Sequence, residues 1–174
     1  MFGGFTKATS ENGILRCQMR ITIKVVILAV LVTLIIHPGY AIPLPQDDSV
    51  RAAFELLLRA DDVKGSSVGI AGARPKEYDA FATLWKAGKT ADNYALKLVC
   101  DGTPAARVYG AILLLELDEA AARREFPRLI EDKTIVRIWP GGCVGRHERV
   151  GALVRKLENG ESIIRTPNGV GVPR

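Results

Sequence analysis

Apolar residues recur through the middle of the chain at the spacing of amphipathic helices. In stretches that start near residues 48, 76 and 90, they fall at positions i, i+3, i+4 and i+7, which places them on one face of an α-helix. The first stripe consists of Val50, Ala53, Phe54, Leu57 and Leu58. Further helix starts are expected near residues 104, 119 and 145. The middle starts lie 14 or 15 residues apart, which predicts helices joined by tight turns and packed as antiparallel neighbours.

Residues 104–117 depart from this pattern because they are apolar on every side. Thr103 is suited to cap a helix there, and Pro104 is suited to its first turn. Only Arg107 and Glu116 are charged in this stretch. A helix without a polar face is expected to be the most buried of the domain. Its small residues would let neighbouring helices approach closely, and they are Ala105, Ala106, Gly110 and Ala111.

The C-terminal third of the chain mixes strand and helix signals. β-branched residues in 133–139 predict a strand, which we expect to pair with residues 161–166. Between them, Val150, Leu153, Val154 and Leu157 form the stripe of a last helix. A short strand is expected at 68–71, and Pro127 is expected to divide its segment into two helical pieces. The pattern predicts a mainly α fold of antiparallel helix pairs, HEAT-like or a small bundle, with a small C-terminal β-hairpin.

A hydrophobic segment near the N-terminus predicts export. Basic residues precede the twelve apolar or near-apolar residues from Val25 to Ile36, and Gly39 and Ala41 follow as small residues. This order is typical of a secretory signal peptide. The alternative is an uncleaved anchor formed by residues 21–36, with Lys24 reaching toward the lipid headgroups. We expect 1–41 to be a signal peptide or anchor, 42–47 a linker, 48–166 a helical domain outside the cytoplasm (periplasmic or secreted), and 167–174 a flexible tail.

Charge argues against nucleic-acid binding. The formal net charge of the chain is +5. Residues 1–41 contribute +3 of it, because they hold four basic residues and one acidic residue. The remainder is close to neutral, so the high isoelectric point belongs partly to the leader and does not indicate a basic binding face.

Two cysteines, Cys100 and Cys143, lie in the part expected to be exported, whereas Cys17 precedes the hydrophobic segment. An oxidising compartment permits a disulfide between the first two. Two separate thiols are the alternative, and the sequence leaves both open.

Residues 96–117 carry a family resemblance. A first helix ends in aliphatic residues, a turn contains Asp-Gly, and a second helix has an arginine followed by small and aliphatic residues. The residues concerned are Leu96, Leu98, Val99, Asp101, Arg107, Ala111, Leu114 and Leu115. This arrangement resembles one unit of a HEAT-type α-helical repeat. The resemblance implies a fold that binds other proteins, and it covers 22 residues.

Cys143 and His147 form the arrangement that most suggests catalysis. If a helix has begun at Cys143, the two lie at i and i+4 and are neighbours, and an imidazole can activate a thiolate. No third residue is identifiable that would orient the histidine, and both residues continue the stripe of the last helix, so packing is the preferred interpretation. As metal ligands they supply two groups where zinc takes three or four. Cys100 and Asp101 would complete a set only if the fold brought them close.

The sequence contains no nucleotide-binding or hydrolase motif of the Walker, GxGxxG, HExxH or GxSxG type. We therefore expect no catalytic residue, no metal and no cofactor. The predicted function is an exported or membrane-anchored, helical-repeat-like module that binds another protein. It would bind no nucleic acid and would touch a membrane only through its N-terminal segment. The alternative is an envelope enzyme with Cys143 as nucleophile and His147 as base.

Overall fold

The computed structural model describes residues 47–168. The chain divides into two units, Met1–Ile42 and Pro43–Arg174, and the described residues all belong to the second. The predicted signal peptide or anchor, almost all of the linker and most of the tail lie outside the described residues. Between residues 47 and 168, no helix has both the length and the apolar content that crossing a membrane requires.

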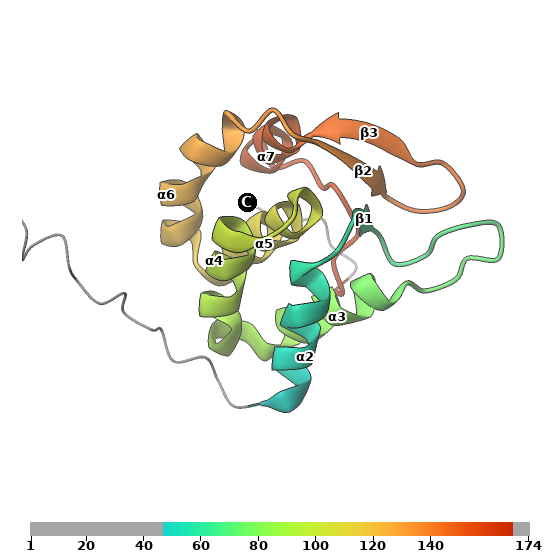
Figure 1. Cartoon of the computed structure of the whole chain (residues 1–174), viewed down its shortest axis with the longest axis horizontal. Coiled ribbons are helices and arrows are strands. Elements are labelled where there is room, and N and C mark those ends of the chain that lie inside the picture. The colour runs from blue at the N-terminus through green and yellow to red at the C-terminus, as the bar shows by residue number, and fades with distance from the viewer. Residues whose placement is uncertain (1–46, 169–174) are drawn as a thin grey trace, which may run out of the picture. The chain divides into compact units, whose positions relative to one another are not determined.

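Helices dominate the described part of the chain, which confirms the predicted mainly α class (Figure 1). Most of them begin within two residues of the expected positions. Asp118 caps the helix that starts at Glu119, its Oδ1 accepting a hydrogen bond from the Ala121 amide at 2.9 Å. The helices are α2 (Asp48–Leu58), α3 (Lys76–Ala87), the 3-10 helix η1 (Gly88–Ala91), α4 (Asp92–Asp101), α5 (Pro104–Leu117), α6 (Glu119–Ile130) and α7 (Val150–Glu158).

Helix α5 lies at the centre of the core, as its apolar sequence predicts. Nine of its residues are buried, from Ala105 to Leu114. Thr103 caps its start, because the Thr103 hydroxyl accepts from the Ala106 amide at 3.2 Å and donates to the Ala60 carbonyl at 2.6 Å. The charged Arg107 pairs with Asp132, Nη1 to Oδ2 at 2.7 Å, and so ties α5 to the segment after α6.

Helices α4 and α5 pack closely at a glycine. A methyl group added to Gly110 would lie 2.8 Å from the Ala95 carbonyl oxygen and 2.9 Å from the Leu98 Cβ. Glycine at this position is therefore what allows the two backbones to approach, as the small residues of α5 predict.

A three-stranded sheet covers one side of the helices, in the order β1-β2-β3. Strand β1 (Asp62–Lys64) runs parallel to β2 (Ile135–Trp139), and β3 (Arg146–Arg149) runs antiparallel to β2. In register, Asp62 lies beside Arg137, which in turn lies beside His147. The buried residues of β2 are Val136 and Ile138, so its other face is turned away from the core.

Three predictions about this region are wrong. The partners of 133–139 are β1 and β3, and residues 161–166 form no strand, because Ile163 and Ile164 are both buried in succession where a strand would alternate. The last helix begins at Val150 rather than near 145, since β3 occupies the intervening residues. Residues 68–71 form no strand and contribute only two isolated bridges, both at Val68, to Ala73 and to Gly142.

Helix α6 continues through Pro127, so the predicted division into two pieces is also wrong. Proline removes one backbone donor and crowds the preceding turn. Buried Phe126 and Leu129 flank Pro127 and fix the helix to the core on both sides of it, which compensates for the missing hydrogen bond.

Candidate functional site

Cys143 and His147 do not lie on the last helix, so the preferred interpretation that they pack on its apolar stripe is wrong, and the helical pairing on which the catalytic alternative depended is not formed. Cys143 lies in the turn between β2 and β3, and His147 lies on β3, so neither is on a helix and the i, i+4 relation is lost. Both side chains are exposed, and within residues 47–168 neither makes a hydrogen bond or an ion pair. The arrangement lacks the oriented base that a thiol nucleophile requires.

The predicted disulfide is absent from the structure, in which Cys100 and Cys143 are both exposed free thiols. Cys100 lies near the end of α4, with Arg128 Nη2 4.0 Å from its sulfur, whereas Cys143 lies in the β2–β3 turn. Burial raises the pKa of the Cys100 thiol, and the nearby Glu125 carboxylate raises it further. Such a thiol is less reactive than an ordinary one.

Metal ligands do not gather anywhere in residues 47–168, where no group of three or more His, Cys, Asp or Glu side chains could hold an ion. In particular, the set of Cys100, Asp101, Cys143 and His147 is not assembled.

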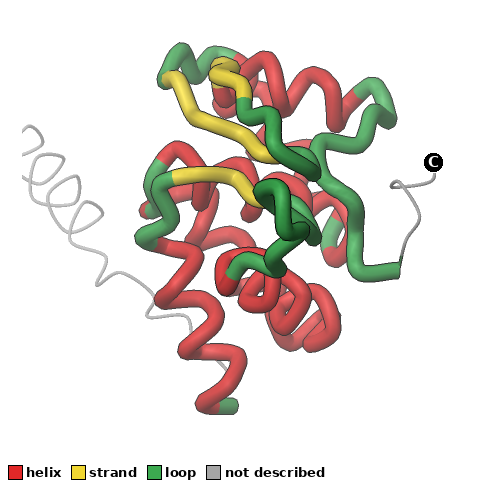
Figure 2. The backbone as a smooth tube through the Cα atoms, turned by 90° about the vertical axis from the view of Figure 1, so that its right-hand side faces the viewer, coloured by secondary structure: helices red, strands yellow, loops and turns green. Residues whose placement is uncertain are grey.

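Two loops that leave the sheet side by side form the most distinctive surface feature. Strands β1 and β2 run parallel and lead into residues 65–75 and 140–145 respectively. The two loops are joined, because the Gly69 amide donates to the Gly142 carbonyl at 2.9 Å and the Gly142 amide donates to the Ser67 carbonyl at 3.0 Å. They project together from the right-hand side of the domain in Figure 1, the side that faces the viewer in Figure 2. We call residues 65–75 and 140–145 the double-loop tip.

The double-loop tip presents large aliphatic side chains to solvent. Ile70 is 98% exposed and Val144 is 77% exposed. Val68 and Gly142 form a bridge between the loops. Ile70 follows Val68 by two residues and Val144 follows Gly142 by two residues, so both belong to the outer part of the tip. Positive φ angles at Gly69, Gly72 and Gly142 make the tight turns that hold them there.

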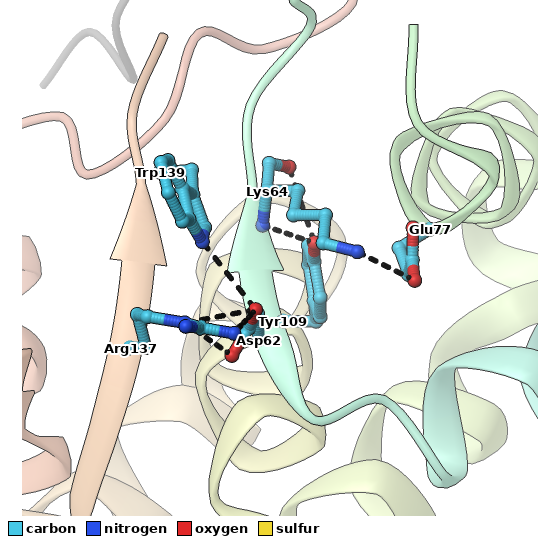
Figure 3. A network of polar contacts seen from close by, with 6 residues as sticks. All are labelled: Asp62, Lys64, Glu77, Tyr109, Arg137 and Trp139. Atoms are coloured by element: carbon cyan, nitrogen blue, oxygen red, sulfur yellow. Dashed lines mark hydrogen bonds and ion pairs between the residues drawn. The ribbon is translucent and has the colours of Figure 1, made fainter. Parts of the chain in front are cut away.

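A polar network holds the base of the tip (Figure 3). The Asp62 carboxylate accepts from Arg137, Nη2 to Oδ2 at 2.7 Å, and from the Trp139 indole at 3.3 Å. Burial opposes ionisation of Asp62, but the hydrogen bonds from Arg137 and Trp139 outweigh it and lower the pKa of Asp62. The Arg137 guanidinium also lies 5.5 Å from the centre of the Trp139 ring, and that ring leaves no room for a side chain at Gly145.

Tyr109 of α5 attaches the base of the tip to the core. Its buried hydroxyl accepts from the Lys64 amide at 2.6 Å and donates to the Lys64 carbonyl at 3.1 Å. The Lys64 ammonium pairs with Glu77 of α3 at 3.0 Å. The strand that leads into the first loop is therefore fixed to two helices, and the tip stands on a rigid base.

Two arginines flank the apolar side chains of the tip in the sequence. Residues 65–75 and 140–147 contain Arg74 and Arg146 and no Asp or Glu. Both guanidinium groups are about half exposed, and each pairs through Nε with a nearby carboxylate, Arg74 with Asp79 and Arg146 with Glu148. At the end of β2 away from the tip, Ile135 on the outward face is 62% exposed and is paired in register with Arg149. The surface thus combines exposed aliphatic side chains with cations.

Sequence reasoning missed this surface. Its signal was available in the printed sequence, where GSSVGIAGA and PGGCVG each place one or two large aliphatic residues inside a glycine-rich loop. Nothing in the sequence indicated that two loops about 70 residues apart would lie together, which follows from the parallel pairing of β1 with β2.

Comparisons of the chain with protein-family models, with curated proteins and with solved structures found no match.

Proposed function

We propose that this domain is a protein-interaction module that docks through its double-loop tip. The observation that carries the proposal is the exposure of Ile70 and Val144 on two loops that are hydrogen-bonded to each other and whose flanking strands are anchored by the network around Tyr109 and Asp62. Apolar side chains held in water on a preorganised element favour binding, because little conformational entropy is lost when a partner covers them.

The chemistry of the tip specifies the kind of partner. Ile70 and Val144 fit an apolar depression. Arg74 and Arg146 each use Nε in an ion pair within the chain, and their half-exposed guanidinium groups favour further carboxylates around the rim of that depression. The partner surface is therefore a protein face that is apolar at its centre and acidic at its edge. In this proposal the helices serve as the scaffold for the tip, in the manner of an interaction module with HEAT-like helix pairs.

Export is part of the proposal. The basic residues and the apolar segment Val25 to Ile36 support a domain that works outside the cytoplasm, released by cleavage of the leader or anchored by residues 21–36. A partner would then be met in the periplasm, at the membrane surface or outside the cell.

Site-specific photo-crosslinking in the expressing cell tests the proposal. A photoreactive phenylalanine analogue replaces Val144 or Ile70 in the full chain, and Ala52, an exposed residue of α2, is the matched control position. We expect protein adducts from positions 144 and 70 that disappear when Arg74 and Arg146 are changed to Glu, and no such adducts from position 52. Equal labelling at all three positions, or adducts with lipid alone at the tip, would contradict the proposal.

A further inference from the structure

A groove on another part of the domain has the properties that the double-loop tip requires of a partner. It has a volume of about 630 Å³ and lies where the ends of α5 and α7 meet α6. Its floor is apolar and includes Phe126 and Leu157, and its rim carries Glu116, Glu119 and Glu158. We call it the α6 groove.

The α6 groove favours a cation. Three carboxylates line it against one guanidinium, that of Arg123, which is already paired with Glu119 at 2.6 Å. Within residues 47–168, Glu116 and Glu158 make no ion pair. Both lie in the last turns of their helices, α5 and α7, where the backbone carbonyls add partial negative charge. The last turn of α5 holds no basic residue, and the two in the last turn of α7, Arg155 and Lys156, are paired with Glu131 and Glu148.

The two surfaces lie apart on the same domain. Helix α6, one wall of the groove, is on the opposite side of the domain from the two loops in Figure 1. A tip therefore cannot reach the groove of its own chain, but it can reach the groove of another copy.

We propose that a second copy of this chain is one partner, with the double-loop tip of one copy seated in the α6 groove of the next. The inference rests on the proposed function of the tip. Val144 and Ile70 would cover the apolar floor, while Arg146 and Arg74 would face Glu116 and Glu158. Because each copy offers one tip and one groove, the contact is heterologous, and repeated use closes into a ring or continues as an open chain.

The size and chemistry of the contact set its strength. We expect a contact made by two short loops to bury a small surface area. Complexes that bury less than roughly 1,200 Å² are weak and transient. Association should therefore depend on protein concentration. Because its charges lie at the rim, it should weaken as salt rises.

Sedimentation of the full chain and its variants tests the inference through complementation. The tip variant carries Ile70→Glu and Val144→Glu, and the groove variant carries Glu116→Lys and Glu158→Lys. Two control variants, Ala52→Glu and Asp61→Lys, make the same kinds of substitution at single exposed residues that lie outside both surfaces. Circular dichroism checks that every variant is folded. All proteins are compared in the same form and buffer at concentrations up to about 1 mM, which suits a weak complex.

We expect the average mass of the wild-type chain to rise with concentration beyond that of a dimer, and both controls to behave likewise. The tip variant alone and the groove variant alone should each associate at least about tenfold more weakly, because a charge is placed in an apolar contact or the rim charge is reversed. An equimolar mixture of the two variants should form dimers and nothing larger, since only one intact tip and one intact groove remain in each pair.

Three results would overturn the inference: a wild-type chain that stays monomeric throughout, association that survives in the tip variant, or a mixture of the two variants that stays monomeric. A dimer lost in the tip variant but kept in the groove variant would show tip-to-tip pairing and would also overturn it. None of these results bears on whether position 144 crosslinks to a different protein. Failure of head-to-tail association can therefore be distinguished from failure of the proposed docking function.

Discussion

Replacing Tyr109 with phenylalanine removes one oxygen atom from the centre of the structure. The ring is fully buried and lies 5.7 Å from the ring of Phe81, centre to centre. Tyr109→Phe keeps these packing contacts. It removes the hydroxyl that serves the Lys64 amide and the Lys64 carbonyl together.

The loss of stability expected in Tyr109→Phe follows from the Lys64 amide and the Lys64 carbonyl, which lose their hydrogen-bond partner. Lys64 is on β1, an edge strand, and its amide and carbonyl bond Tyr109 rather than β2. Losing a hydrogen bond while leaving a buried partner unsatisfied costs about 1–3 kcal/mol. Because Lys64 is only half-buried, water can replace part of the loss, and we expect the free energy of unfolding to fall by about 2 kcal/mol.

Urea unfolding followed by circular dichroism measures this change, with Tyr78→Phe as the matched control. Tyr78 is also buried, but its hydroxyl donates a single hydrogen bond, to the Arg165 carbonyl at 3.0 Å. Tyr109→Phe should therefore destabilise the domain more than Tyr78→Phe. Hydrogen exchange adds a local test, because the Lys64 amide should lose its protection in Tyr109→Phe and keep it in Tyr78→Phe.

The stability of the domain at alkaline pH provides a second test of the same hydroxyl. Burial raises the pKa of Tyr109 above its ordinary value of 10. The folded state therefore favours the neutral phenol, and this contribution to stability is complete below pH 10 and is lost as the pH rises above it. Wild-type stability should fall more steeply above pH 10 than that of Tyr109→Phe. The argument would be refuted if Tyr109→Phe and Tyr78→Phe lost the same free energy of unfolding and if wild type and Tyr109→Phe lost stability equally above pH 10.

Three further predictions concern other contacts. Asp62→Asn should cost about 1 kcal/mol at pH 7, since the Arg137 side chain is about half exposed; because the folded-state pKa of Asp62 is lowered, the difference from wild type should shrink as the pH falls below 3.8 in acid-unfolding curves. Gly110→Ala should lower the free energy of unfolding, measured in urea, by about 1–3 kcal/mol, because crowding against Ala95 exceeds the gain in helix propensity of about 1 kcal/mol; a stabilised variant would contradict the close approach. Cys100 should react with iodoacetamide without reductant, and more slowly in the native than in the urea-unfolded protein, because its pKa is raised; a thiol blocked until reduction would instead indicate the disulfide.

Local patterns were sufficient to predict the helices. The stripe in residues 48–58, the cap at Thr103 with Pro104, and the apolar sequence of α5 all express interactions between residues a few positions apart. Gly110 was expected among the small residues that allow close packing, and it lies at the contact between α4 and α5. The side chain of Tyr109 was expected to be buried, but its bonding partner lies 45 residues away and has no local signal.

Strand pairing could not be predicted because it depends on loop closure and on burial. Residues 161–166 contain two adjacent isoleucines and look more strand-like than RHER in β3. A hairpin from β2 to β3 closes a loop of only 140–145, whereas pairing with 161–166 would close one of more than twenty residues at a larger entropic cost. Burial of Ile163 and Ile164 in the core then removes the competitor.

The same sheet explains why docking should use side chains rather than an added strand. A sheet of order β1-β2-β3 has two edges, and an open edge invites pairing with another chain. Tyr109 closes the β1 edge by bonding the amide and carbonyl of Lys64. On β3, the exposed charged residues Arg146 and Arg149 oppose strand addition, as charged edge residues do. Because both edges are protected, the proposed docking depends on the exposed aliphatic side chains of the double-loop tip.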